Sequence, residues 1–528
     1  MAGIALLNGG VHTMDDGLPL AQAVVILEGR ILAVGRNSEI LHRAKGTWER
    51  IDLEGKTVFP GLIDSHVHFL GFALGLDRVD LDGLASLTKC VERVRARVRK
   101  AEPGTWIIGR GWNYNRWIEQ RFPHKKDLDP ISPNHPIVLS SKDGHLLWVN
   151  TKALKITGIT KDTPDPPGGQ IERDVSGDPT GILKENASSL IWSVVPMPSV
   201  QVQRNALRKG IEIANRLGLT GLHVPEGKDS FIGFQTLRDE GTLTLRVTIM
   251  PPQSALEALI ELGIQSGFGD ENLRMGPVKL FVDGALGGQT AAMLEPYEGD
   301  LDNTGVLTTS DEELRDVVLR ASEAGINIAV HAIGDRGNRI ALDAIEAAIE
   351  TIRRRRLRPR IEHAQLLTPE DIQRLGQLGV IASMQPIHAT SDWIMADRHW
   401  GARCQGAYAW RSILKAGGRL CFGSDSPVES LDPLKGIYAA VTRKDEEGKP
   451  EGGWIPEQCL SVEEAVYAYT MGAAFAVGEE HVSGSITPGK RADMIVLSDD
   501  LFANPPERIL DTKVVMTVVG GQIVFSKE

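Results

Sequence analysis

Near its start the chain reads Val58-Phe59-Pro60-Gly61-Leu62-Ile63-Asp64-Ser65-His66-Val67-His68-Phe69. Apolar residues on both sides of this run are typical of a strand buried on both faces, as in a parallel sheet covered by helices. His66 and His68 stand at positions i and i+2, which lie on one face of a strand. Two imidazoles that point the same way can share a metal ion, so we expect later strand ends to supply further ligands.

Strand-like and helical runs alternate after this stretch, which favours a parallel α/β architecture. Strands are predicted at residues 58–68, 219–224, 244–250, 277–283, 326–332, 359–364, 379–385 and 419–425. Eight strands with helices between them predict a (β/α)8 TIM-like barrel over residues 58–484, with its chemistry at the C-terminal strand ends. The first connection is far longer than an ordinary crossover. We therefore expect residues 70–200 to form a large insertion, a lid subdomain.

The two ends of the chain have a different pattern. Residues 1–57 and 485–528 alternate short apolar runs with turn signals, which is typical of hairpins. Neither end has enough strands for a core of its own. The two ends are therefore predicted to pack together as one small, discontinuous β-sandwich, whose edges offer a route to a homodimer.

Composition excludes several classes of partner. The 528 residues carry a formal charge of −11 and a pI near 5.7, which argues against nucleic acid or an anionic membrane as the main partner. The four cysteines lie far apart without CxxC spacing, which indicates free thiols in a reducing compartment. No run is apolar enough to span a membrane, and the N-terminus lacks a signal-peptide pattern. We expect a soluble cytoplasmic protein.

Later strands do end on polar residues. His331 closes the fifth predicted strand, His363 the sixth and Asp425 the eighth. A lone histidine or aspartate at a strand end is more often structural than a ligand. Together with the first two histidines, however, these residues would meet at one end of one barrel, which favours a metal site.

Lys279 lies inside the fourth predicted strand, in Val278-Lys279-Leu280-Phe281. A buried, unpaired ammonium is costly and would repel a nearby cation. Carboxylated by CO2, the side chain becomes an anion that can bridge two metal ions. An ordinary lysine paired with Asp283 or another barrel carboxylate is the alternative, and Glu185 is a weaker rival for the bridging position.

Aromatic residues gather in two places, although they make up only 5% of the chain. The first group, around His145, contains Trp106, Trp112, Tyr114, Trp117, Phe122 and Trp148, and the second contains Trp393, Trp400, Tyr408 and Trp410. Both groups can form the core of a lid or line a pocket over the barrel mouth. In the second interpretation the substrate has an apolar or aromatic part, and the predicted substrate-binding residues are Trp112, Tyr114, Trp117, Asp283, Arg336 and Trp393. Arg336 either anchors a substrate carboxylate or forms an ion pair that fixes its loop.

The order of motifs resembles the metal-dependent amidohydrolase superfamily, in detail its amidohydrolase 3 (YtcJ-like) branch, which includes N-substituted formamide deformylases. The motifs that carry the resemblance are Pro60-Gly61-Leu62-Ile63-Asp64-Ser65-His66-Val67-His68, Asp143-Gly144-His145, Lys279-Leu280-Phe281-Val282-Asp283-Gly284-Ala285-Leu286-Gly287, Val330-His331-Ala332-Ile333-Gly334-Asp335, Ile361-Glu362-His363-Ala364-Gln365, Met384-Gln385-Pro386-Ile387-His388, Gly423-Ser424-Asp425-Ser426-Pro427-Val428 and Pro488-Gly489-Lys490-Arg491-Ala492-Asp493. Each motif is weak alone, but in this order they are specific and cover nearly the whole chain.

The resemblance implies a binuclear metal centre. His66, His68 and Asp425 would hold the more buried ion, His331 and His363 the second, and a carboxylated Lys279 would bridge them. Zinc is favoured, although histidine and carboxylate ligands also suit manganese, iron and cobalt. His145 and His388 match positions near the substrate. One departure is that His223 is followed by Val224-Pro225-Glu226, where the family tends to carry His-Asp.

The predicted function is hydrolysis of a carbon–nitrogen bond in a non-peptide amide, with N-acyl or N-formyl amines that bear an apolar group favoured. Two divalent ions lower the pKa of a shared water to near 7. Asp425 would take the proton of the attacking water and pass it to the leaving amine. His145 or His388 would hold the developing oxyanion, a role worth about 3–4 kcal/mol. The alternatives are an esterase, lactonase or carbamate hydrolase with the same centre, or a catalytically silent scaffold.

Overall fold

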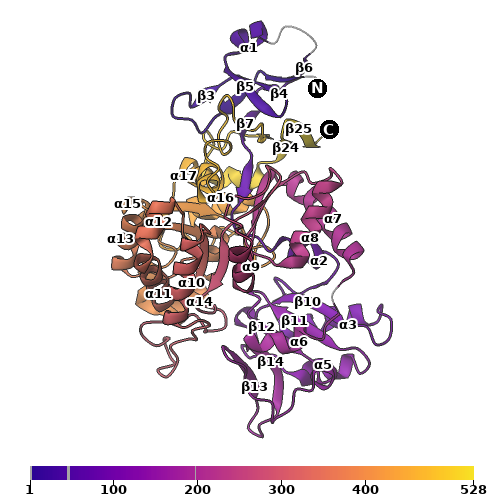
Figure 1. The fold of residues 1–528 in the computed structure, drawn as a ribbon. Coiled ribbons are helices and arrows are strands. Elements are labelled where there is room, and N and C mark those ends of the chain that lie inside the picture. Colours follow the sequence, from indigo (N-terminus) through magenta and orange to yellow (C-terminus); the bar gives the residue numbers. More distant parts are fainter. Residues whose placement is uncertain (1–2, 44–47, 197, 528) are drawn as a thin grey trace.

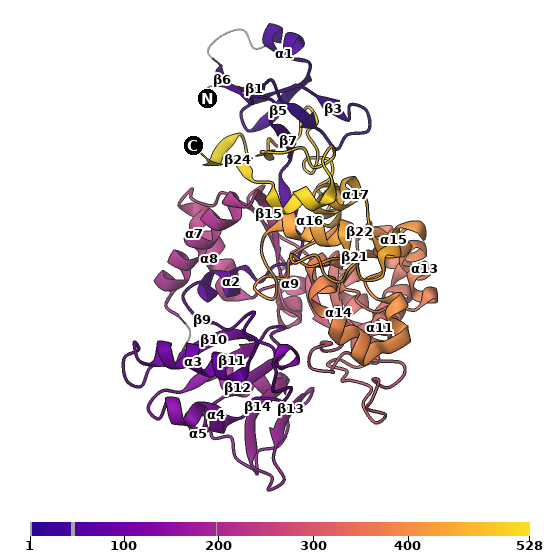
Figure 2. The same ribbon diagram turned by 180° about the vertical axis from the view of Figure 1, so that it is seen from behind.

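The computed structural model describes residues 3–43, 48–196 and 198–527. Strands from both ends of the chain lie at one end of the molecule, next to the N- and C-termini (Figure 1). Parallel strands covered by helices occupy the centre, and an inserted α/β part lies at the opposite end. The view from behind shows the same order (Figure 2).

Two parallel sheets form the centre. The first contains β8 (Leu62–Asp64), β15 (Leu219–Val224), β16 (Arg246–Ile249) and β17 (Leu273–Met275), and the second contains β18 (Val278–Phe281), β19 (Ile328–Ala332), β20 (Arg360–His363), β21 (Ile381–Met384) and β22 (Arg419–Phe422). All neighbouring strands in both sheets pair in parallel. Most of their residues are buried, as expected when helices cover a parallel sheet.

Backbone hydrogen bonds also connect the two sheets. Ser65 N–H donates to the carbonyl of Phe422 over 3.0 Å, and Lys279 N–H donates to the carbonyl of Pro251 over 2.8 Å. These bonds bring the carboxyl ends of β8 and β22 together, and they join the segment after β16 to β18.

Helices cover the central sheets. They are α2 (Phe69–Gly75), α7 (Val200–Arg216), α8 (Lys228–Asp239), α9 (Leu256–Glu261), α10 (Asp311–Glu323), α11 (Asp335–Ala347), α12 (Ile349–Arg355), α13 (Pro369–Leu378), α14 (Pro386–Trp400), α15 (Trp410–Lys415), α16 (Pro433–Thr442), α17 (Val462–Tyr469) and α18 (Met471–Ala476). Within the described ranges, no helix combines the length and the apolar character needed to cross a membrane.

The seven later strand predictions each contain a strand of the structure, but the prediction of one strand over residues 58–68 is wrong. β7 (Thr57–Pro60) pairs with strands of the terminal sheet, whereas β8 pairs with β15. The break falls at Gly61, where a Cβ atom would collide with the side chain of Thr220. His66 and His68 therefore lie beyond the end of β8 and not on the face of a strand.

Strands from both ends of the chain form two further sheets. One has the order β5 (Arg30–Gly35), β4 (Ala23–Leu27), β1 (Ile4–Leu7) and β6 (Glu49–Asp52), with α1 (Asn37–Arg43) beside it; the other has the order β25 (Gln522–Ser526), β24 (Val514–Val519), β23 (Met494–Leu497), β7, β2 (Gly10–His12) and β3 (Leu20–Ala21). One apolar cluster joins residues of both ends, among them Val24, Val58, Met494 and Val518.

The inserted part contains a six-stranded sheet. Its elements are β9 (Val79–Asp80), α3 (Leu87–Val98), β10 (Ile107–Trp112), α4 (Lys125–Leu128), β11 (Ile137–Ser141), β12 (Leu146–Val149), α5 (Thr151–Thr157), β13 (Gly169–Arg173), β14 (Pro179–Glu185) and α6 (Ser189–Trp192). Trp112, Trp117 and Trp148 are fully buried and pack in edge-to-face or tilted pairs, with ring centroids 6.1–6.5 Å apart. The insertion thus has an apolar core of its own.

Candidate metal centre

The histidines and the aspartate predicted from strand ends meet at one place. His331 lies in β19, His363 ends β20, and Asp425 follows β22. His66 and His68 follow β8, whose end is hydrogen-bonded to β22. All five line one cavity of about 740 Å³ between the central sheets and the insertion.

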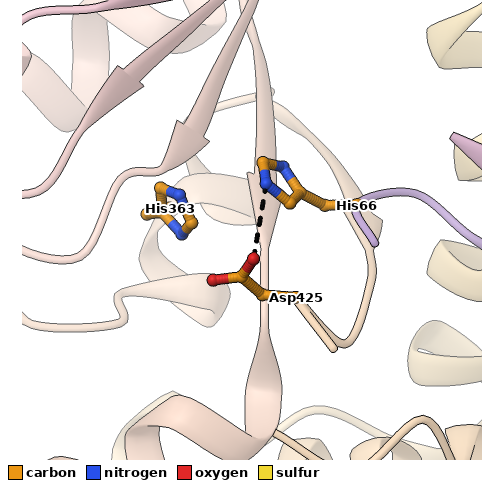
Figure 3. A group of neighbouring side chains, drawn as sticks. All are labelled: His66, His363 and Asp425. Carbon is orange, nitrogen blue, oxygen red and sulfur yellow. Dashed lines mark ion pairs between the residues drawn. The ribbon is translucent and has the colours of Figure 1, made fainter. Parts of the chain in front are cut away.

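Three of these side chains converge closely enough to share one cation. His66, His363 and Asp425 each present a ligand atom within 4.8 Å of the others, and all three are buried. Figure 3 shows the two imidazoles and the carboxylate facing a common space. His66 Nε2 lies 3.6 Å and His68 Nε2 lies 3.4 Å from Asp425 Oδ1.

Buried polar atoms without partners surround the same space. Within the described part of the chain, no hydrogen-bond partner is found for His66 Nε2, Lys279 Nζ or Asp425 Oδ1. Such atoms are costly to bury unless a ligand satisfies them. Imidazole nitrogen and carboxylate oxygen are suitable donors for a divalent cation, so the residues present fit a metal ion.

A buried ion pair orients His66. Its Nδ1 donates to Glu362, which in turn accepts from Arg360. Arg360 also donates to the carbonyl of Ser65 over 2.6 Å and to Nδ1 of His223 over 3.1 Å. The acceptor at Nδ1 fixes the His66 tautomer and directs Nε2 toward Asp425, the arrangement that metal-binding histidines need.

His331 and His363 are held in the same way. His363 Nδ1 donates to the side-chain oxygen of Gln385 over 2.8 Å, and His331 Nε2 donates to the carbonyl of Gly284 over 3.1 Å. The two ring centroids are 4.6 Å apart. Burial holds the pKa of both imidazoles well below 6.5, so they stay neutral, the form that binds metal.

Lys279 has no carboxylate within 4 Å among the residues described. Burial lowers the pKa of its ammonium to about 8. The ion pair with Asp283 is not formed, because that carboxylate accepts three backbone N–H groups, from Ala292, Ile333 and Gly334, over 2.8–3.0 Å. Asp283 therefore fixes the loops after β18 and β19 while it lines the cavity.

Glu185, the rival for the bridging position, is engaged in the insertion. Its Oε2 lies 2.7 Å from His145 Nδ1, and its other oxygen accepts from Thr290. Burial lowers the pKa of His145, but Glu185 raises it by more, to about 9. His145 is consequently a cation at neutral pH and lies beside His331, with ring centroids 5.7 Å apart.

His388 approaches Asp425 from the first turn of α14. Its Nε2 lies 3.3 Å from Asp425 Oδ2, and its Nδ1 lies 3.8 Å from Glu429, which also pairs with Lys142 over 3.0 Å. Burial lowers the pKa of His388, but hydrogen bonds to Asp425 and Glu429 raise it by more, to about 10. Two protonated histidines, 145 and 388, thus flank the candidate ligands.

The predicted substrate-binding residues divide into two groups. Trp112, Tyr114 and Asp283 line the cavity. Trp117, Arg336 and Trp393 are not among its described lining residues. Trp117 belongs to the insertion's core, Arg336 is exposed on α11, and Trp393 packs against the main apolar cluster.

Several supporting residues were not predicted. They are Arg360, Glu362, Gln385, Glu429 and Lys142, each of which holds a candidate functional side chain through space. The sequence carries a weak signal for two of them, Arg360 and Glu362, because a charged Arg-x-Glu pair inside a buried strand requires internal partners. After His223, where the sequence differs from the family's usual His-Asp, the carboxylate of Glu226 accepts hydrogen bonds from the N–H groups of Leu70 and Gly71 over 2.9 Å and so caps α2.

Comparison with known proteins agrees with this geometry. Residues 49–525 match the model of the amidohydrolase family. The putative amidohydrolase YtcJ of Bacillus subtilis is 34% identical, covering 99% of each chain. The N-substituted formamide deformylase of Arthrobacter pascens is 31% identical, covering 100% of this chain and 99% of that protein.

Solved structures give the same assignment. The crystal structure of an uncharacterised metal-dependent hydrolase from Pyrococcus horikoshii superposes with a TM-score of 0.78 at 28% identity, covering 96% of this chain and 99% of that one. The family match spans nine-tenths of the sequence and includes all the candidate ligands. This chain belongs to the amidohydrolase family.

Proposed function

We propose that this protein is a metal-dependent hydrolase that cleaves the carbon–nitrogen bond of a non-peptide amide, an N-acyl or N-formyl amine with an apolar or aromatic group. The observation that carries the proposal is the set of buried, unpartnered atoms of His66, Lys279 and Asp425 at the base of one cavity. Tyr114 on the cavity wall supports the apolar part of the substrate. The similarity to a formamide deformylase supports the amide.

The assignment of ligands follows the resemblance to the amidohydrolase family. His66, His68 and Asp425 would hold one divalent cation, and His331 and His363 a second. The ligand atom of His363 also lies within 4.8 Å of those of His66 and Asp425. Lys279 would bridge the two cations once its ammonium has lost a proton and the neutral amine has added to CO2 with release of a second proton, which replaces an unpaired cation by an anion. Zinc is the first candidate, and manganese, iron and cobalt suit the same donors.

The proposal includes the architecture around the site. The two parallel sheets would form one closed (β/α)8 barrel between residues 62 and 484, with β17 and β18 as two parts of one barrel strand, because backbone hydrogen bonds join the sheet edges. Residues 70–200 would act as its lid, and the N-terminal residues through β7 with residues 485–528 as a separate β-sandwich. The cavity would then lie at the C-terminal strand ends, the usual place for chemistry in this fold.

The chain's own residues would handle the protons. When bound, the cations would polarise the amide carbonyl and lower the pKa of a water near the site. Asp425 would accept a proton from that water as the new C–O bond forms, and would give it to the nitrogen as the C–N bond breaks. His388, 3.3 Å from Asp425, would hold this carboxylate in place for both transfers.

His145 and His388 would also provide positive charge for the oxygen of the amide. Both are protonated at neutral pH, because neighbouring carboxylates raise their pKa values to about 9 and about 10 against the effect of burial. A donor that already carries its proton stabilises a developing oxyanion without reorganisation.

The test combines metal content with turnover. Protein purified without chelator is analysed for metal and assayed with N-phenethylformamide and its ester counterpart, 2-phenylethyl formate. We expect close to two ions per chain and faster cleavage of the amide than of the ester relative to the uncatalysed rates. Asp425→Asn should abolish turnover and leave the far-ultraviolet circular dichroism unchanged. Preference for the ester would indicate an esterase, and a metal-free, inactive protein would refute the hydrolase.

A further inference from the structure

Two arginines on the insertion face the same cavity without a partner. Arg78 lies just before β9 and Arg110 lies in β10, and both line the cavity of the candidate metal centre. Neither guanidinium has a carboxylate within 4 Å among the residues described. The Arg78 side chain makes no hydrogen bond there, and Arg110 makes one, to the carbonyl of Lys142 over 3.3 Å.

Lys142, also on the insertion side of the cavity, is neutralised by carboxylates, in contrast to the two arginines. The ammonium of Lys142 lies 3.0 Å from Glu429 and 3.7 Å from Asp82. Its charge is therefore used inside the protein, where it attaches the insertion to the loop after β22. The charges of Arg78 and Arg110 have no such ion pair among the residues described and face the cavity.

Electrostatics make this arrangement unfavourable in the free protein. Burial and then the charge of Arg110 lower the pKa of Arg78, and no carboxylate offsets them. Burial also lowers the pKa of Arg110, although Asp82 and Asp80 act on it from a longer distance. Two partly desolvated cations in one cavity are stabilised when an anion enters between them.

The arginines also lie within reach of the candidate ligands. α2 begins directly after His68 and spans seven residues, which corresponds to about 10 Å. Arg78 follows at its end, where its N–H donates to the carbonyl of Gly75 over 3.0 Å. A small molecule at the metal centre can therefore extend one polar group to Arg78 and Arg110.

We propose that Arg78 and Arg110 bind a carboxylate of the substrate, so that the substrates are N-acyl or N-formyl amino acids and not neutral amides. This inference rests on the proposed amide hydrolysis. Guanidinium groups match the planar carboxylate with paired hydrogen bonds. They also bind phosphate, but Asp80 and Asp82 beside Arg110 favour a singly charged anion. The exposed Arg336 does not reach this cavity in the described structure and cannot replace them.

The test uses substrates that differ by one group. N-formylphenylalanine carries the carboxylate that N-phenethylformamide lacks, and its phosphonate analogue carries a larger charge. We expect the metal-loaded wild type to favour N-formylphenylalanine over the other two in kcat/KM by about 10- to 100-fold, the range for a hydrogen bond to a charged group. Arg78→Gln and Arg110→Gln should each remove this preference by raising KM for N-formylphenylalanine.

Two further variants separate charge from folding. Arg78→Lys should restore part of the preference, because it keeps the charge without the paired geometry. Arg97→Gln, on the exposed face of α3, is the matched control and should change nothing. Equal rates on the acid and the neutral amide, in wild type and variants, would overturn the carboxylate site and leave amide hydrolysis standing. Preference for the phosphonate would overturn the assignment to a carboxylate.

A binding measurement distinguishes failure of this inference from failure of the proposed function. Calorimetry with phenylacetate needs no turnover. If no amide is cleaved but phenylacetate binds the wild type about 10-fold more tightly than Arg78→Gln, the anion site stands and the proposed reaction falls. If the affinities are equal, the anion site is refuted whatever the protein hydrolyses.

Discussion

Replacing Glu362 with glutamine should both destabilise the fold and weaken metal binding, for two separable reasons. The Glu362 carboxylate is fully buried and accepts from Arg360 and from His66 Nδ1. An amide oxygen can replace only one of these acceptors, and its NH2 group then faces a donor. The buried guanidinium loses its counter-charge at the same time.

The size of each effect follows from the contacts. Removing one partner of a buried ion pair costs about 3–5 kcal/mol in the free energy of unfolding, because the other charge stays buried. Loss of the acceptor that orients a metal-binding histidine lowers affinity about 10- to 100-fold. The double variant Arg360→Met/Glu362→Leu removes both charges, so it should recover most of the stability while the affinity stays low.

The assay measures the two quantities independently. Urea unfolding of metal-stripped proteins, followed by tryptophan fluorescence, reports stability without a contribution from bound metal. Competition with a chromogenic chelator reports the affinity for zinc. Glu370→Gln is the matched control, since that carboxylate is 72% exposed in its pair with Arg339. If Glu362→Gln were as stable as the double variant, or if both bound zinc like the wild type, the reasoning would be refuted.

Three further outcomes are expected. The His145–Glu185 pair should make stability depend on pH. Burial alone would lower the pKa of His145, but Glu185 raises it from 6.5 to about 9 on folding. The contribution of the pair to stability is therefore complete below pH 6.5 and is lost as pH rises through 9. His145→Gln should therefore cost up to about 3 kcal/mol at pH 6 and little at pH 10 in urea unfolding; a pH-independent cost would contradict this. Of the four cysteines, only Cys459 is not fully buried, so one thiol should react rapidly with a thiol reagent in the native protein, and more than one would contradict the burial. Trp117→Ala should lower the free energy of unfolding by about 3–5 kcal/mol, because it leaves a cavity in the core of the insertion, and should leave KM unchanged. A raised KM with normal stability would instead indicate that Trp117 contacts the substrate.

The sequence predicts most of the later central strands because they are short, mainly apolar runs, although β17 lies outside the predicted ranges. Ile328–His331 shows why this works: both faces of the strand are buried, so its pattern needs no knowledge of its partners. The division of the first strand at Gly61 could not be predicted. Pro60 and Gly61 mark a break, but the two halves join sheets whose other strands, at Ile495 and Leu219, lie far away along the chain.

The site shows the same limit. The meeting of His331 and Asp425 at one cavity is predictable, because strand ends of parallel sheets gather at one edge. The role of Glu362 is not, because its partner His66 lies almost 300 residues earlier and only the folded chain brings them together. Substrate contacts of Trp117 and Trp393 are predicted from the gathering of aromatic residues, and composition alone does not distinguish a side chain packed in an apolar cluster from one on a cavity wall.

The pairing of β7 with β23 also has a consequence for the order of assembly during translation. Phe59 is opposite Ile495 in this pair, so the partner strand is made more than 400 residues after β7. At about 5–20 residues per second, the delay is about 20–90 s. Until then, β7 has β2 on one side and no partner on the other, whereas β8 and the residues after it can already bond to β15 and to the segment around β22. The sheet that joins the two ends of the chain can therefore close only after the ribosome has nearly finished synthesis.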